Sequence, residues 1–97
     1  MTVEDTVKVR AVSSEWTEIK QRDTSSLTGK AFLLGMVSPA QTLVEYAVVD
    51  DSVNIQVATE FSTKSPMLVG KNVATGKKAY IRGKGVDVDV AVEIGTV

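Results

Sequence analysis

The stretch Val86-Asp-Val-Asp-Val-Ala-Val-Glu-Ile94 decides the fold class. Its aliphatic residues occupy every second position, and acidic residues or alanine stand between them. Successive side chains of a β-strand point to opposite faces, so this period of two predicts a strand with one buried and one solvated face. Such strands are typical of antiparallel sheets. A helix would scatter the valines around its axis, and a run of β-branched residues disfavours helix.

Further strands are predicted from the remaining apolar segments. Turn signals rich in Ser, Asp, Gly and Pro separate these segments at intervals of roughly 8–12 residues, as a sandwich or barrel requires. One helical turn is expected near residues 39–42. The additional strands are expected at residues 6–12, 15–21, 31–37, 43–49, 53–59 and 77–82. We therefore expect one all-β domain over residues 1–97, an antiparallel β-sandwich or flattened barrel of about seven to eight strands.

The composition excludes several kinds of chemistry. The chain has 97 residues and contains no histidine and no cysteine. Without imidazole or thiolate it cannot use Ser-His-Asp or Cys-His catalysis, and it has no zinc–thiolate or histidine metal ligand. No apolar run is long enough to cross a bilayer, and the first residues are acidic rather than apolar. We therefore expect a protein that is not an enzyme, holds no cofactor and has no membrane association.

Two glycine-containing segments invite comparison with ligand-binding loops. In Gly70-Lys-Asn-Val-Ala-Thr-Gly76, five residues separate the glycines where a phosphate-binding loop has four, and Lys78 stands in place of the required Ser or Thr. The segment Gly83-Lys-Gly85 joins two strand signals. We interpret both segments as hairpin turns.

Two pairs of aspartates are candidates for a cation site. Asp87 and Asp89 share one face of the last strand, and Asp50 and Asp51 lie in a turn. Carboxylates in such positions could bind Ca²⁺. Because no EF-hand-like spacing is present, a solvated strand face and a polar turn explain them better, and we expect no metal.

The charge is unevenly distributed along the chain. Net charge is −1, but residues 61–85 contain six bases and no acid, which predicts a basic edge on an otherwise acidic molecule. This edge is a candidate contact for an acidic neighbouring subunit, a solvated surface, or a nucleic-acid site, and a pI of about 5.3 disfavours nucleic acid. Trp16 is expected to be a packing anchor, with a sugar-binding or interface platform as the alternative. The candidate interaction residues are Lys64, Lys71, Lys77, Lys78, Arg82, Lys84, Trp16 and Tyr80.

Three segments together resemble a known group of proteins. They are Ala-Val-Ser-Ser-Glu-Trp-Thr-Glu-Ile at residues 11–19, the apolar strand from Ala31, and Gly-Lys-Lys-Ala-Tyr-Ile-Arg-Gly-Lys-Gly at 76–85, which leads into the final valine-rich strand. The pattern resembles small β-sandwich virion proteins of tailed bacteriophages, such as head-decoration, head-fibre-base and tail-accessory proteins. The resemblance implies a structural protein that is made in the host cytoplasm, self-associates and joins other virion proteins on a symmetric particle. It carries no catalytic residue across.

Two other function classes stay open. A small binding module would use the basic edge to bind carbohydrate, nucleic acid or an acidic protein, and an inhibitor would block a host enzyme by surface mimicry. A core this thin, without disulfides, is marginal alone, and exposed strand edges need to be covered. We therefore expect a homo-oligomer, whereas a monomer would favour the inhibitor or the simple binding module.

Overall fold

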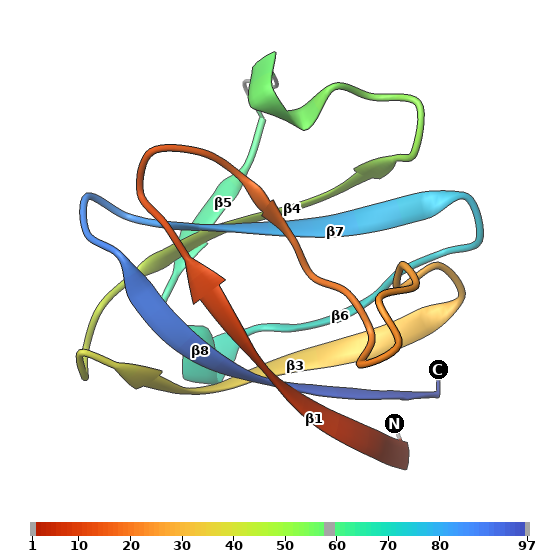
Figure 1. Cartoon of the computed structure of the whole chain (residues 1–97), viewed down its shortest axis with the longest axis horizontal. Coiled ribbons are helices and arrows are strands. Elements are labelled where there is room, and N and C mark those ends of the chain that lie inside the picture. Colours follow the sequence, from red (N-terminus) through yellow and green to blue (C-terminus); the bar gives the residue numbers. More distant parts are fainter. Residues whose placement is uncertain (1, 58–59, 97) are drawn as a thin grey trace.

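A computed structural model describes residues 2–57 and 60–96. Two four-stranded antiparallel sheets pack face to face (Figure 1). Sheet A has the order β1-β8-β3-β6, and sheet B has the order β2-β7-β4-β5. The strands are β1 (Thr2–Ala11), β2 (Thr17–Glu18), β3 (Lys30–Ser38), β4 (Val44–Asp50), β5 (Ser62–Lys64), β6 (Gly70–Asn72), β7 (Lys77–Gly83) and β8 (Val88–Thr96). The expectation of an all-β antiparallel sandwich is confirmed.

Strand β8 lies at the centre of sheet A, between β1 and β3. Its alternating side chains behave as the sequence predicts: the aliphatic row is buried and the residues between are half-buried on the outer face. The buried row consists of Val88, Val90, Val92 and Ile94. Val86 precedes the strand and is exposed, so the alternation begins to act structurally only at Val88.

The main core lies between the two sheets. Its largest fully buried side chains include Phe32 and Leu34 from β3, Ile81 from β7, and Ile19 and Leu27 from the segment between β2 and β3. Burying a side chain of this size contributes about 1.5–3 kcal/mol relative to leaving it exposed. The apolar residues of both sheets and of their connection therefore hold the two layers together.

The connections between strands mostly cross from one sheet to the other. β6 lies in sheet A, β7 in sheet B, and β8 again in sheet A. The hairpin interpretation of residues 70–78 and of residues 83–85 is therefore wrong, because each segment joins strands of different sheets. Among the strands in the described residues, β4 and β5 are the one consecutive pair that is hydrogen-bonded. Alternation in a sequence indicates a strand and its buried face, but not the neighbouring strand.

The predicted strand at residues 53–59 is also wrong. A 3-10 helix, η1 (Ile55–Val57), takes its place, and residues 58 and 59 lie outside the described residues. The side chain of Asn54 accepts a hydrogen bond from the Gln56 N–H at 3.1 Å, which favours a local turn. Of the three alternating apolar residues, Ile55 is buried whereas Val53 and Val57 are exposed, so no strand face is formed.

Other boundaries differ more modestly. The expected strand at 15–21 is reduced to β2 and an isolated bridge between Lys20 and Ser26. Residues 39–42 form a turn without a helix. The short strands β5 and β6 were not expected, and a second 3-10 helix, η2 (Pro66–Leu68), lies between them. Each of these two strands has three residues, which is too few to show a period in the sequence.

Gly83 ends β7 at a close approach of backbones from both sheets. Its N–H donates to the Val12 carbonyl at 3.1 Å, which joins the end of β1 to the end of β7. A Cβ on Gly83 would lie 2.9 Å from the Ala11 carbonyl oxygen and still closer to the Val86 carbonyl oxygen. Because both obstacles are backbone atoms, only glycine fits here.

We predict that Gly83→Ala destabilises the fold by about 3 kcal/mol, because backbone must move to relieve the overlap. Gly70→Ala is the matched control: its added Cβ would meet the end of the Leu33 side chain at 3.2 Å, which can move. We expect the control to stay within about 0.5 kcal/mol of the parent chain. Urea unfolding followed by circular dichroism measures both, and equal stabilities would contradict the close-approach argument.

Candidate functional site

A groove of about 630 Å³ separates the edge strands β1 and β2. Residues 6–10 of β1 form one wall, and residues from the segment 17–22 form the other. The charged residues lining it are Lys8, Arg10, Lys20 and Arg22, with Glu18 as the one acid among them. The lining is therefore rich in bases, although Arg10 and Arg22 are each paired with an aspartate of the same chain. We call this groove the basic groove.

The wall formed by β1 is an open strand edge, since β8 is the one strand among residues 2–57 and 60–96 that pairs with it. Thr6 shows which backbone groups face the groove: its N–H donates to Asp5 Oδ1 at 2.8 Å, and its carbonyl accepts from Arg22 Nη2 at 2.6 Å. Residues of an antiparallel pair alternate between bonding the partner strand and pointing away from it. The backbone groups of Lys8 and Arg10 therefore point away from β8, as those of Thr6 do.

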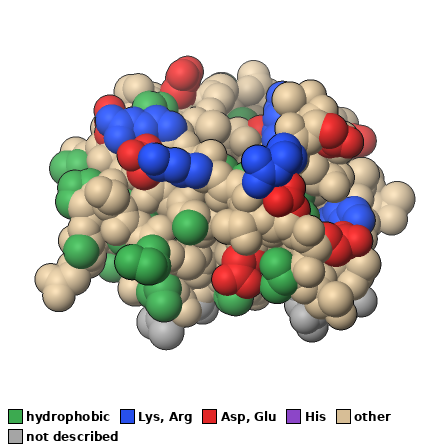
Figure 2. Space-filling model, turned by 60° about the horizontal axis from the view of Figure 1, so that its bottom comes forward, with side chains coloured by type: hydrophobic (Ala, Val, Ile, Leu, Met, Phe, Trp, Pro, Cys, Tyr) green, Lys and Arg blue, Asp and Glu red, His purple; other side chains and the backbone are tan. Residues whose placement is uncertain are grey.

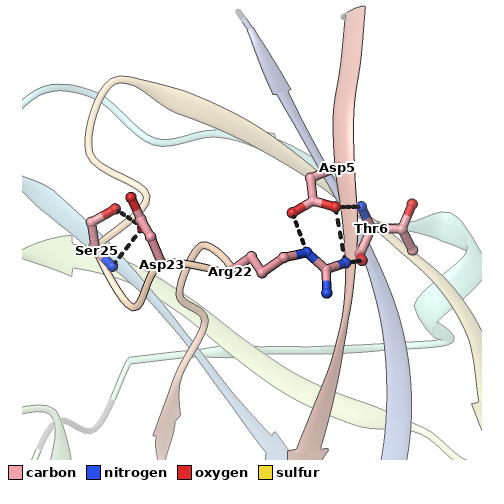
Figure 3. A network of polar contacts seen from close by, with 5 residues as sticks. All are labelled: Asp5, Thr6, Arg22, Asp23 and Ser25. Carbon is pink, nitrogen blue, oxygen red and sulfur yellow. Dashed lines mark hydrogen bonds and ion pairs between the residues drawn. The ribbon is translucent and has the colours of Figure 1, made fainter.

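Arg22 closes one end of this open edge (Figure 3). Its Nε and Nη2 bond the two carboxylate oxygens of Asp5 at 2.9 and 3.0 Å, in addition to the Thr6 carbonyl. The hydrogen bonds from Arg22, and then that from the Thr6 N–H, hold the pKa of the Asp5 carboxyl below its usual value. We call this contact the Asp5–Arg22 clasp. Both backbone groups of Thr6 are occupied, so another strand cannot bond there.

A tight turn presents Arg22 to β1. The Gln21 N–H bonds the Ser25 carbonyl at 2.8 Å, and Thr24 adopts a positive φ of 71° within the turn. The carboxylate of Asp23 accepts hydrogen bonds from the hydroxyl and the N–H of Ser25, and these lower the pKa of Asp23. The turn is thus held by its own polar groups and leaves the Arg22 side chain free to reach across the groove.

The other end of the open edge is closed by the turn after β7. The Val12 carbonyl accepts from Gly83, and the Ser13 N–H donates to Asp87 Oδ1 at 2.9 Å. Between the clasp and this turn, the open part of β1 is Lys8–Arg10. It offers four backbone groups, the N–H and the carbonyl of Lys8 and of Arg10.

Three of the four aspartates considered as cation ligands are engaged with bases. Arg10 lies 3.3 Å from Asp89 and 3.8 Å from Asp87, and Lys77 lies 3.1 Å from Asp50. Within residues 2–57 and 60–96, no group of three or more acidic, histidine or cysteine side chains is placed to hold a metal ion. Across the same residues, no helix is long and apolar enough to cross a membrane.

The basic residues of segment 61–85 do not form one edge. Lys77 and Lys84 stand at opposite ends of β7, so the length of a seven-residue strand separates them. Lys64 is on β5, Lys71 is on β6, and Lys78 follows Lys77 on β7. Lys71 lies 5.8 Å from the centre of the Tyr46 ring. The structure spreads these candidates over several surfaces.

Trp16, Tyr80 and Arg82 are brought together, on the outer face of sheet B. Trp16 is 4% exposed and packs with Ala47 and Ile55, and Tyr80 covers this cluster. The expected role of Trp16 as a packing anchor is confirmed, although its cluster is separate from the main core. So little exposed ring leaves no platform for a sugar.

Arg82 completes this cluster between two rings. Its guanidinium lies 4.3 Å from the centre of the Trp16 ring and 5.1 Å from that of Phe61, and its Nε bonds Glu45 at 2.7 Å. The side-chain amide of Gln56 bonds both the N–H and the carbonyl of Trp16 at 3.1 Å. These contacts hold the connection between β4 and β5 against sheet B, which is a structural task.

The basic groove was not predicted from the sequence. Its four bases stand in the first quarter of the chain, among Glu4, Asp5, Glu15, Glu18 and Asp23, so no acid-free window marks them. The available signal was the alternation of Lys8 and Arg10 with valines, which places both bases on one face of a strand. The clasp joins residues 17 positions apart and has no local signature.

Comparison with known proteins gives no family assignment. No protein-family model matches the sequence, and no curated protein or solved structure matches it significantly. The candidate site therefore rests on its geometry and charge.

We predict that stability decreases as the pH falls below about 4. The pKa values of Asp5 and Asp23 are lowered in the folded protein, so the unfolded chain takes up protons at a higher pH than the folded one. Their contribution is complete above the unfolded pKa and is lost as the pH falls through the lower folded pKa. Melting temperatures from pH 7 to pH 2 measure this, and the double variant Asp5→Asn with Asp23→Asn should show a shallower decline. An unchanged decline would contradict the assignment.

We predict that Arg22→Gln lengthens the open edge, because the Thr6 carbonyl loses its partner and becomes able to bond another strand. The variant should associate several-fold faster than the parent chain, as followed by light scattering at equal concentration. Lys20→Gln removes a charge from the same groove without touching Thr6, and it should behave like the parent chain. Equal association of both variants would show that the clasp does not protect the edge.

Proposed function

We propose that this chain is a non-enzymatic structural protein that self-associates as a component of a bacteriophage particle, as a capsid-decoration or tail-accessory protein. The observation that carries the proposal is a group of exposed apolar side chains at one end of the sandwich. The loose resemblance to small virion β-sandwiches supports the choice of particle, and the self-association is argued from the apolar group.

The exposed apolar group lies where several connections meet. Met36 is near the end of β3 and is 77% exposed, and Met67, 64% exposed, lies on η2, which packs against β3. Leu43 and Val86 are also exposed, and the Lys84 N–H bonds the Leu43 carbonyl at 3.3 Å, which brings their connections together. These connections share one end of the molecule (Figure 1, left). We call these four residues the apolar end.

The surface view supports an uneven distribution of apolar groups. With the sheet A side turned forward, hydrophobic side chains gather toward the left, whereas Lys and Arg alternate with Asp and Glu along the upper part (Figure 2). A contiguous apolar patch on a soluble protein commonly marks an interface. A second copy is the occupant we favour, because an apolar contact around a two-fold axis needs no charge complementarity.

Self-association also suits the size of the domain. A chain of 97 residues buries only roughly 60–65% of its unfolded surface, which is less than a larger domain buries, so burial of the apolar end would add to its stability. On a symmetric particle, weak contacts repeated over many copies add up, since each later contact forms at a high effective concentration. A structural protein needs no more than such contacts.

A small binding module is the second candidate. The observation in its favour is the basic groove beside an open strand edge, which a purely structural role would not require. An inhibitor of a host enzyme belongs to this class, with the groove rather than the scattered lysines as its contact.

We predict that the double variant Met36→Lys with Met67→Lys weakens self-association at least about tenfold, because charge replaces the centre of the apolar contact. Val57→Lys is the matched control: Val57 is 74% exposed, and it lies on η1, on the opposite side of the molecule from η2. Light scattering over a hundredfold dilution measures the oligomer. A parent chain that is monomeric at every concentration, with a constant melting temperature, would contradict the proposal.

The assignment to a particle has its own test. Particles are isolated from a lysate, and the amount of this chain in them is measured by quantitative mass spectrometry. We expect a fixed copy number related to the symmetry of the particle. Recovery only as free protein, or bound one-to-one to a host enzyme, would overturn the structural function and favour the inhibitor.

A further inference from the structure

We propose that the basic groove binds an extended acidic segment of another protein, which adds to β1 as a further strand of sheet A along Lys8–Arg10. The proposal does not rest on self-association, because the apolar end and the basic groove share no residue. The two surfaces are neighbours, since Met36 lines a hollow together with Thr6 and Lys8. The proposal names a partner by its chemistry: an extended chain with carboxylates at alternate positions.

The open edge supplies the backbone contacts. The N–H and carbonyl groups of Lys8 and Arg10 face the groove, and residues two apart in a strand are about 6.7 Å apart. An extended guest chain presents its own outward groups at the same interval, so it can form four hydrogen bonds with these two residues. Adding a strand to a sheet edge is an established way for proteins to bind peptides.

The length of the contact is fixed at both ends. The Asp5–Arg22 clasp occupies Thr6, and Gly83 occupies the Val12 carbonyl. A guest strand is therefore limited to about three central residues, opposite Lys8, Val9 and Arg10. Such a short contact gives a weak and reversible complex unless charge adds to it.

The charge of the groove selects the guest. Side chains opposite Lys8 and Arg10 would lie on the same face as these bases, and Lys20 and Arg22 lie across the groove. Arg10 already pairs with Asp89, and Arg22 pairs with Asp5. Lys8 and Lys20 therefore supply the charge that favours carboxylates in the guest, and an apolar residue fits between these carboxylates, beside Val9. The other side of β1 already shows this pattern, since β8 sets Asp89 opposite Arg10 and Ala91 opposite Lys8.

A second copy of β1 is a poor guest. If two β1 strands paired antiparallel through their open residues, Lys8 would face Arg10 of the other copy, or Lys8 would face Lys8. Like charges directly opposite each other destabilise a strand pair. The groove therefore favours a different chain, and the two bases act together with the Asp5–Arg22 clasp to limit pairing of the open edge with itself.

Nucleic acid is also a weaker match. The edge presents carbonyl groups as well as N–H groups, and carbonyls repel phosphates. The described residues that line the groove include no aromatic side chain on which a base could stack. Trp16 and Phe61 do lie beside an arginine, Arg82, but all three belong to the separate cluster on sheet B.

The test uses the full chain and a fluorescent peptide of the sequence Thr-Asp-Val-Asp-Val-Asp-Thr with blocked ends. Fluorescence anisotropy measures its dissociation constant at low and at physiological salt. We expect it to bind at least about tenfold more tightly than a peptide with Lys in place of Asp, with affinity that falls as salt rises. Bound peptide should slow amide hydrogen exchange at Lys8 and Arg10.

Variants separate the backbone contact from the charge. Lys8→Pro removes an N–H that faces the groove, and proline is tolerated at such edge positions; we expect binding to weaken at least about fivefold more than in Lys8→Gln, which keeps the N–H. Lys64→Gln, on β5, is the control for net charge and should bind like the parent chain. If Lys8→Pro fails to fold, a peptide N-methylated at alternate residues tests the same hydrogen bonds on the unaltered protein.

Several results would overturn the proposal. They are equal affinity for the acidic and basic peptides, full binding by the N-methylated peptide, and exchange protection at residues outside β1. Tighter binding of a single-stranded oligothymidine than of the acidic peptide, with protection of the same amides, would assign the groove to nucleic acid instead.

Discussion

Burial of the aliphatic row on β8 is the interaction on which the rest of the structure depends. Val88, Val90, Val92 and Ile94 fill the centre of the core, and the backbone of the same strand holds β1 on one side and β3 on the other. Within the described residues β8 is the one strand that pairs with β1, so β8 largely sets the position of β1. The open edge at Lys8–Arg10 is thus a direct consequence of where the valine row places its neighbours.

The two ends of β1 contact sheet B in different ways. Where β1 meets the turn after β7, the approach at Gly83 is so close that the sheets are bonded to each other. Beside β2 the sheets diverge, and a single arginine reaches across the space. The end of β1 next to Val12 is thus bonded to β7, whereas the part of β1 beside β2 borders the groove. The groove between β1 and β2 is therefore the place where we propose that a guest chain binds.

The sequence allowed the strands with a clear period to be predicted, and with them the fold class. Val88–Ile94 and the apolar strand at Lys30–Ser38 were recognisable because burial acts on alternate residues of one segment. Strand pairing was not recognisable, because Gly83 and Val12 are far apart in the chain. Alternation failed at Ile55, where the local bond between Asn54 and Gln56 favours a turn. The bases of the groove have no clear signal in the sequence because acidic residues stand among them along the chain. The fold collects these bases from two separated segments.

The pairing of β1 with β8 also fixes a polarity of the molecule. Thr2 lies opposite Thr96 at one end of sheet A, and the apolar end lies at the other (Figure 1). Polypeptide joined before Thr2 or after Thr96 leaves side by side, directed away from Met36 and Leu43. The domain is thereby suited as a display scaffold: a payload fused at either terminus projects outward while the opposite end stays available for contacts.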